Sequence, residues 1–201
     1  ELGVGAEDGI WIIFPDTMGL AKSYTRINAT TGGFAGVFDT DDQFGTAIEA
    51  VGDLDGDGVD DIAVGAPLDD DGGSDKGAVW ILFLYADGTV KSHQKISGTQ
   101  GGFTGTIDAY DNFGISLGAL GDLDGDGVED LAVGVYNDDD GGSSRGAVYI
   151  LFLNTDGTVK GFQKISDTVG GFAGTLDNSD MFGVSVTSLG DLDGDTVVDI
   201  A

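Results

Sequence analysis

The sequence has no cysteine, so disulfide bonds, thiolate metal sites and cysteine nucleophiles are all excluded. It has one histidine and only two prolines among 201 residues. Basic residues are also scarce, since eight Lys and Arg stand against 36 Asp and Glu and leave a net charge of −28. Such a charge repels the phosphates of nucleic acids and of anionic membranes, so we expect neither partner. Metal cations are the partners that this composition favours.

Long apolar runs are missing too. The longest covers residues 78–86, well short of the ~20 residues of a membrane-spanning helix. Hydrophobic residues nevertheless make up 40% of the chain and charged residues only 22%, which predicts a packed core. No stretch shows the 3.6-residue spacing of an amphipathic helix. We therefore expect no membrane insertion and an all-β fold.

What the chain does contain is glycine, 37 residues of it, and an internal repeat with a step of 69 residues. GDLDGDGVDDIAVG at 52–65 returns as GDLDGDGVEDLAVG at 121–134 and as GDLDGDTVVDIA at 190–201. A repeat of this length indicates an array of similar supersecondary units. A Phe-Gly pair precedes each copy at the same step: Phe44-Gly45, Phe113-Gly114 and Phe182-Gly183.

Each unit is expected to contain four short antiparallel strands, which are clearest in the second repeat. They cover residues 113–122, 130–136, 146–153 and 158–166. The third of them is apolar without a break, which indicates burial on both faces. Four strands per unit in an array are typical of β-propeller blades, and a mixed β-sandwich is the alternative.

The repeat divides the chain into about three blade equivalents of a larger propeller or array. Residues 1–30 are expected to form the last three strands of a partial blade, 31–97 and 98–166 a blade each, and 167–201 the start of a third unit. Both chain ends fall within a second strand, at the same phase of the repeat. We therefore expect either an excerpt of a longer protein or a complete subunit that joins its neighbours head to tail.

Carboxylates crowd the segments 53–61, 122–130 and 191–199, which we call the first acidic loops. Acidic residues occupy loop positions 1, 3, 5 and 9, and position 7 offers a backbone carbonyl. Alternate oxygens around a sharp glycine turn at position 6 can converge on one calcium ion, which offsets the repulsion between them. The predicted ligands are Asp53, Asp55, Asp57, Val59 and Asp61; Asp122, Asp124, Asp126, Val128 and Asp130; and Asp191, Asp193, Asp195, Val197 and Asp199.

The third loop departs from the other two at position 6, where Thr196 replaces glycine. A left-handed backbone there costs a β-branched residue about 1–2 kcal/mol, so weaker or altered binding is predicted. At position 8, Asp60 and Glu129 give way to Val198, and we expect this position to face solvent. Acidic turns that bind no metal are the alternative for all three loops.

Together, Phe44-Gly45, the first acidic loop and Gly65-Ala66-Pro67 resemble the FG-GAP repeat of integrin alpha-subunit β-propellers and their bacterial relatives. The resemblance extends over nearly the whole chain, although the second unit has Gly134-Val135-Tyr136 in place of Gly-Ala-Pro. It implies a seven-bladed propeller with calcium in the loop that joins the first two strands of a blade. It also implies an extracellular or cell-surface location and, often, adhesion or ligand recognition.

A second acidic loop connects the second and third strands of each complete unit. The resemblance places this loop on the face opposite the first acidic loops, where ligands of the family bind. It is a second cation site, part of a recognition surface or a solvated acidic turn. Its carboxylates are Asp69, Asp70 and Asp71 in one unit and Asp138, Asp139 and Asp140 in the next.

Three smaller features also follow the repeat or a short motif. Asn28-Ala29-Thr30 fits the pattern of an N-glycosylation acceptor. Each Gly-Gly-Phe segment supplies a ring that we expect to pack between blades: Phe34, Phe103 and Phe172. An aspartate two residues before each Phe-Gly pair is expected to cap a turn: Asp42, Asp111 and Asp180.

Catalysis finds little support, because no Ser/His/Asp set can be assembled around His93 and no phosphate-binding glycine motif is present. The leading hypothesis is a calcium-binding propeller module of a secreted or cell-surface protein, not an enzyme, that mediates adhesion or recognises a protein or glycan ligand. The alternative is a structural repeat of a calcium-rigidified surface layer or filament, in which neighbouring subunits supply further blades. An accessory domain of an enzyme is a third hypothesis.

Overall fold

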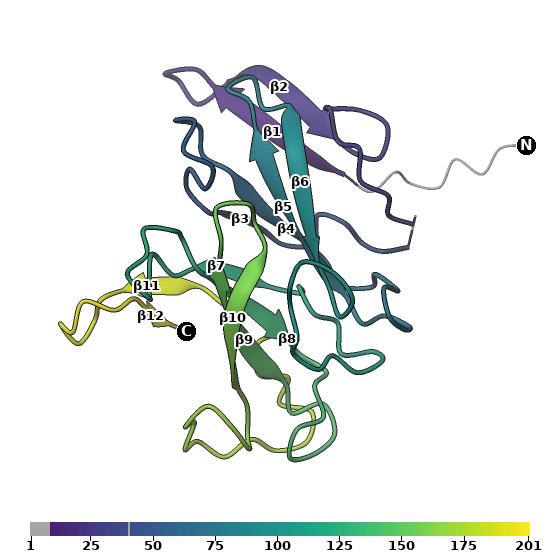
Figure 1. The fold of residues 1–201 in the computed structure, drawn as a ribbon, viewed down its shortest axis with the longest axis vertical. Helices are drawn as coiled ribbons and strands as arrows, with labels where there is room; N and C mark the ends of the chain where they lie inside the picture. The colour runs from purple at the N-terminus through teal and green to yellow at the C-terminus, as the bar shows by residue number, and fades with distance from the viewer. Residues whose placement is uncertain (1–8, 40) are drawn as a thin grey trace, which may run out of the picture.

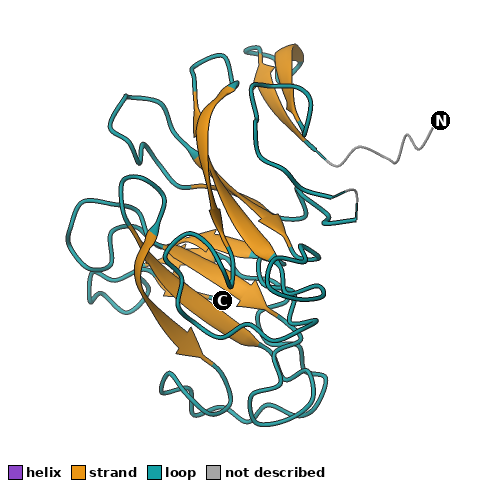
Figure 2. Cartoon of the chain, turned by 45° about the vertical axis from the view of Figure 1, so that its right-hand side comes forward, coloured by secondary structure: helices purple, strands orange, loops and turns teal. Residues whose placement is uncertain are grey.

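The computed structural model describes residues 9–39 and 41–201, which form strands joined by turns and loops (Figure 2). Within these residues there is no helix, and so none that could span a membrane. Two four-stranded antiparallel sheets make up the middle of the chain, and a two-stranded sheet lies at each end (Figure 1). The predicted all-β fold with blade-like sheets is therefore confirmed.

Each four-stranded sheet pairs its strands in sequence order, as an antiparallel meander does. The first comprises β3 (Ile48–Ala50), β4 (Ile62–Ala66), β5 (Ala78–Leu84) and β6 (Val90–Ile96). The second comprises β7 (Leu117–Ala119), β8 (Leu131–Val135), β9 (Ala147–Leu153) and β10 (Val159–Ile165). The first strand of each sheet is shorter than predicted, because the Phe-Gly segment before it turns toward the neighbouring blade: Phe113 forms a parallel bridge with Gly77.

The two-stranded sheets are the ends of neighbouring units. β1 (Ile10–Pro15) pairs with β2 (Ala21–Ile27), and β11 (Ser188–Gly190) pairs with the short β12 (Asp199–Ile200). These pairs correspond to the last two strands of one blade and the first two of another. The remaining strand predicted for residues 1–30 falls before β1 and lies outside the described residues.

Strand β5 is buried on both faces, as its unbroken apolar sequence predicts. Successive side chains of a strand point to opposite faces, so β5 contributes to two separate cores. Strand β9 repeats this pattern in the second blade, with one exception at its half-buried Phe152. In β5, the residues of one core are Val79, Ile81 and Phe83, and those of the other are Trp80, Leu82 and Leu84.

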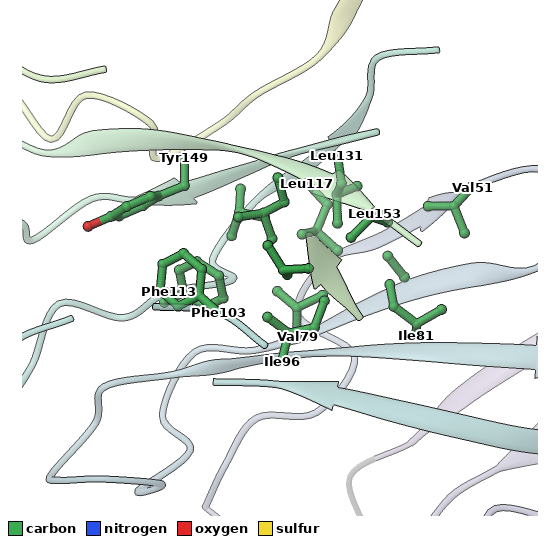
Figure 3. Close-up of a cluster of buried hydrophobic side chains, with 14 of the residues drawn as sticks. Val51, Val79, Ile81, Ile96, Phe103, Phe113, Leu117, Leu131, Tyr149 and Leu153 are labelled. Atoms are coloured by element: carbon green, nitrogen blue, oxygen red, sulfur yellow. The ribbon is translucent and has the colours of Figure 1, made fainter. Parts of the chain in front are cut away.

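The core between the two complete blades draws on both sheets. Val79 of β5 and Ile96 of β6 lie in one cluster with Leu131 of β8 (Figure 3). Phe103, in the connection between the blades, joins this cluster with its ring 5.3 Å from the ring of Tyr149. Phe103 therefore packs between blades, as predicted.

The other two phenylalanines of the Gly-Gly-Phe segments occupy different surroundings. Phe34 packs edge-on against Trp80, with ring centroids 5.2 Å apart, in the core that also contains Ile10 and Ile27. Its inter-blade position is confirmed as well. Phe172 stacks on Phe182 but remains 38% exposed.

Glycines bring the backbones of neighbouring blades into contact. Within one blade, the Gly45 N–H donates to the Gly65 carbonyl at 2.9 Å. A β-carbon on Gly65 would lie only 2.0 Å from the carbonyl oxygen of Gly114, which belongs to the next unit. A β-carbon on Gly134 would likewise lie 1.9 Å from the carbonyl oxygen of Gly183. The Phe-Gly and Gly-Ala elements of the repeat are thus the two sides of one backbone contact, where no side chain fits.

Candidate metal centre

The three first acidic loops share one hydrogen-bonded form. The carboxylate at position 1 accepts the N–H groups of positions 5 and 6; in the first loop, Asp53 accepts from Asp57 at 2.9 Å and from Gly58 at 2.8 Å. The N–H of position 7 donates to the carboxylate of position 5, as from Val59 to Asp57 at 2.9 Å. Asp122 and Asp191 make the same position-1 contacts. The three loops therefore share one turn conformation, held by side-chain to backbone hydrogen bonds within the loop.

In each loop, one oxygen from each of three carboxylates lies within 4.8 Å of the other two. Calcium takes oxygen ligands at about 2.3–2.6 Å, so two ligands of one ion can lie about 5 Å apart. All donors are hard carboxylate oxygens, the type that calcium prefers, and the residues therefore fit such an ion. The groups are Asp53, Asp55 and Asp57; Asp122, Asp124 and Asp130; and Asp191, Asp193 and Asp199. The predicted carboxylates outside these groups are Asp61, Asp126 and Asp195.

The position-9 aspartate has a second task that the loop motif does not reveal. Asp61 is fully buried, and its two carboxylate oxygens accept the N–H groups of Leu54 at 3.1 Å and Leu84 at 2.9 Å. Leu84 ends β5, so this side chain ties the loop to the third strand of the blade. Burial raises the pKa of Asp61, and it outweighs the two N–H donors, which lower it.

The second blade repeats this arrangement. Asp130 is also fully buried and accepts from Leu123 at 2.9 Å and from Leu153, the last residue of β9, at 3.1 Å. Asp199 accepts from Leu192 at 2.7 Å in the third loop, where it is only half-buried. The position-9 carboxylate is thus a structural element of every loop, whether or not it also binds a metal ion.

A lysine that the loop motif does not predict reaches the first loop from β6. Lys91 Nζ lies 2.7 Å from Oδ2 of Asp55 and also pairs with Asp57. The hydrogen bond from this ammonium, followed by the Val59 N–H, holds the pKa of Asp57 below its ordinary value. The ammonium group therefore lies between the carboxylates of positions 3 and 5.

The second loop has the same lysine. Lys160 of β10 lies with Nζ 2.8 Å from Oδ2 of Asp124 and also pairs with Asp126. Lys22, Lys91 and Lys160 are separated by the repeat step of 69 residues. Their periodicity is the sequence signal that could have identified them.

Two features of the loop backbone bear on the predictions for positions 6 and 8. Thr196 has a φ of 76°, in the left-handed region that Gly58 and Gly127 occupy at the same position with φ of 89°. The predicted strained conformation of Thr196 is confirmed. Glu129 is half-buried and accepts the Gly121 N–H at 3.1 Å, so the expectation that position 8 faces solvent is wrong in the second loop. Asp60 is exposed, as expected.

At the opposite end of each sheet, one lysine pairs with two of the three carboxylates of the second acidic loop. Lys95 Nζ lies 2.8 Å from Asp69 and 3.1 Å from Asp71, and its ammonium also lies 5.2 Å from the ring centroid of Trp80. The second blade repeats this with Lys164 at 2.6 Å from Asp138 and 2.8 Å from Asp140. Asp70 and Asp139 instead accept backbone N–H groups of their own loops. These contacts are compatible with a recognition surface and with a solvated acidic turn, and the role of the second acidic loops stays a prediction.

The aspartates before the Phe-Gly pairs cap turns, as predicted. Asp42 accepts the Asp39 N–H at 2.8 Å, Asp111 the Asp108 N–H at 2.7 Å, and Asp180 the Asp177 N–H at 2.7 Å. The first two are buried and the third is exposed. Burial raises the pKa of Asp42 and of Asp111 to about 6, against the N–H donor that lowers it.

We expect Asp111→Asn to remove a pH dependence of folding. The folded carboxyl keeps its proton up to about pH 6, whereas the unfolded chain loses it near 3.8, so stability falls as pH rises between these values. Asparagine is neutral and can still accept the Asp108 N–H. The free energy of unfolding of the variant, relative to that of the parent, should therefore rise by about 2 kcal/mol from pH 4 to pH 7. Denaturant unfolding at the two pH values measures this difference. Asp180→Asn, the same cap in an exposed position, is the control; an equal gain there would contradict the role of burial.

The asparagine of the triplet that fits the N-glycosylation pattern is a buried cap. Asn28 is only 1% exposed, and its Oδ1 accepts the N–H groups of Thr30 at 2.9 Å and Thr31 at 2.8 Å. The buried serines Ser97 and Ser166 hold the equivalent position at the ends of β6 and β10. The Asn-Ala-Thr triplet is therefore explained by turn formation.

Comparison with known proteins identifies the repeat. The FG-GAP family, described as "FG-GAP repeat", matches residues 44–82 and 113–151. These segments are FG-GAP repeats of the β-propeller type. Each match runs from the Phe-Gly pair through the first acidic loop into the third strand, β5 or β9.

The chain is also similar to integrin alpha subunits. It is 35% identical over 162 residues to integrin alpha-5 and 32% identical over 161 residues to integrin alpha-4, both of Xenopus laevis. These alignments cover 78% and 79% of the chain but only 14% of each relative. Integrin alpha-PS2 of Drosophila melanogaster is 38% identical over 107 residues, which is 51% of the chain and 7% of that protein.

Proposed function

We propose that the chain is a calcium-binding β-propeller module of a secreted or cell-surface protein, and that it mediates adhesion or recognises a protein or glycan ligand. The similarity to integrin alpha subunits supports an adhesion-related role. Further blades, of the same chain or of neighbouring subunits, complete the sheet array. The role is not enzymatic, and the single histidine, His93, packs against the rings of Phe34 and Trp80.

The observation that carries the calcium assignment is the common form of the three first acidic loops. Each repeats the same contacts of the position-1 carboxylate, and each gathers three carboxylate oxygens within 4.8 Å. Calcium supplies, when bound, the positive charge that offsets the repulsion between these groups. Sites of this extracellular type typically bind with about 10⁻⁴–10⁻³ M affinity.

In this proposal the acidic residues of each loop have different roles. Position 1 folds the loop through its two backbone contacts and offers an oxygen, and position 3 offers an exposed carboxylate. Position 9 anchors the first two loops to the end of the third strand and accepts a backbone N–H of its own loop in the third. Because the ligands converge only in the folded loop, the free energy of calcium binding stabilises the folded chain.

We expect Asp124→Ala to lower stability mainly in the presence of calcium. Asp124 is exposed and accepts no backbone N–H in the structure, so its loss should cost little in a chelator. In millimolar calcium the parent should melt several degrees higher than the variant, because the variant gains less from binding. Melting temperatures with calcium and with chelator check this. Equal melting of the two proteins in excess calcium would contradict the assignment of Asp124.

Light scattering during the same melts separates the two leading functions. A calcium-dependent rise in melting temperature at constant mass supports a binding module. A rise that comes with growing mass supports the calcium-rigidified layer or filament instead. No response to calcium would contradict both.

A further inference from the structure

The lysines that reach the first acidic loops contact the carboxylates that calcium would need. Lys91 Nζ lies 2.9 Å from Oδ1 and 2.7 Å from Oδ2 of Asp55, so it engages both oxygens of position 3. Lys160 does the same with Asp124, at 3.1 and 2.8 Å. Their side chains are only 13% and 24% exposed, so each ammonium is held among its partners.

A calcium ion on the position-3 carboxylate would be a near neighbour of this ammonium. With a calcium–oxygen distance of about 2.5 Å and the ammonium on the same oxygen, the two cations would lie within about 5 Å of each other. At that separation a single and a double positive charge repel strongly, even with partial screening by solvent. The lysine and the ion therefore compete for one set of carboxylates.

The lysines also have a favourable effect on the loop. Each of these two loops has five acidic residues within nine positions, and the ammonium compensates part of their repulsion when calcium is scarce. The position in the fold makes this reach possible: both lysines are the second residue of the fourth strand, which starts at the end of the sheet where the loop lies.

We propose that Lys91 and Lys160 are built-in competitors of calcium, which keep the first acidic loops folded without the ion and lower its affinity. This inference rests on the proposed calcium function. Calcium binding then exchanges one cation for another, and each site fills only at a high calcium concentration. The residues that set the affinity thus include a strand residue more than 30 positions along the chain from the loop.

A calcium titration of the full chain by calorimetry tests the proposal, with the double variant Lys91→Met/Lys160→Met against the parent. Methionine keeps the length of the side chain and removes its charge. We expect affinity at the first two loops to rise about tenfold, or about 1.4 kcal/mol per site. In a chelator the same variant should melt below the parent, and in excess calcium the difference should disappear.

The matched control is Lys95→Met/Lys164→Met. These lysines lie on the same two strands, four residues further along, and pair with the second acidic loops. The control removes the same charge from the molecule but leaves the first acidic loops intact, so calcium affinity should not change. Lys91→Arg/Lys160→Arg keeps the charge at the loop and should retain the low affinity of the parent.

The outcomes separate this inference from the proposed function. Absence of calcium binding in every protein, the parent included, contradicts the calcium function itself. Binding by the parent with unchanged or reduced affinity in Lys91→Met/Lys160→Met overturns competition by lysine and leaves the calcium function in place. An equal increase in the Lys95→Met/Lys164→Met control also overturns it, since the effect would then come from net charge alone.

Discussion

Replacing Gly65 with alanine will destabilise the chain by about 3 kcal/mol, which corresponds to a fall of about 9 °C in Tm for a protein of this size. A β-carbon at this position would meet the carbonyl oxygen of Gly114 at 2.0 Å. The obstacle is backbone of the next blade, which cannot rotate away as a side chain would. The blades must therefore separate, and the shared core between them loses contacts. Thermal and denaturant unfolding measure the effect.

The control for this prediction is Gly161→Ala in β10. Its β-carbon would meet nothing closer than a Phe152 side-chain atom at 3.7 Å, an ordinary van der Waals distance. The same chemical change should therefore leave stability within about 0.5 kcal/mol of the parent. Similar losses in the two variants would show that close approach of the blades does not determine the cost at Gly65.

Asp130→Ala will destabilise the chain by about 3 kcal/mol in a chelator, and by more in calcium because Asp130 also belongs to the carboxylate group of the proposed calcium site. The change leaves the N–H groups of Leu123 and Leu153 without their carboxylate partner, and each unsatisfied buried group costs about 1–3 kcal/mol. The loop would also lose its anchor to the end of β9. Denaturant unfolding in the two conditions checks the prediction.

Asp124→Ala is the control for Asp130→Ala, because it separates the loss of a carboxylate from the loss of a buried anchor. Both variants remove one carboxylate from the same loop, but only Asp130 is buried and bonded to the backbone of another strand. Asp130→Asn retains one carbonyl oxygen and should recover part of the stability. A loss at Asp130 that appears only in calcium would contradict its structural role.

Much of the fold could be predicted from sequence because it depends on short-range patterns. The apolar run at residues 78–84 predicts a strand buried on both faces, and β5 has that burial. Thr196 stands where a glycine turn requires a left-handed backbone, and its φ is 76°. The aspartates before the Phe-Gly pairs cap turns only three residues away.

The parts of the candidate site that the sequence did not predict depend on contacts across the sheet. Lys91 and Asp55 are 36 residues apart, and no local pattern connects them. The anchoring role of Asp61 requires knowing that the end of β5 lies beside the loop. A position in a metal-binding motif indicates a ligand and gives no sign of a second structural role. The repeat step alone carried a usable signal, in the periodic lysines of the fourth strands.

The alternation of β5 between two cores determines how the chain folds. Val79 and Ile81 are covered by residues of the following unit, whereas Trp80 and Leu82 are covered by residues of their own and the preceding unit. A fragment that ended at Ser97 would expose the first set to water, although the repeat itself would be whole. Cooperativity therefore extends across repeat borders, as in other linear arrays where neighbours stabilise one another. The smallest piece that buries β5 completely is one unit together with parts of both its neighbours.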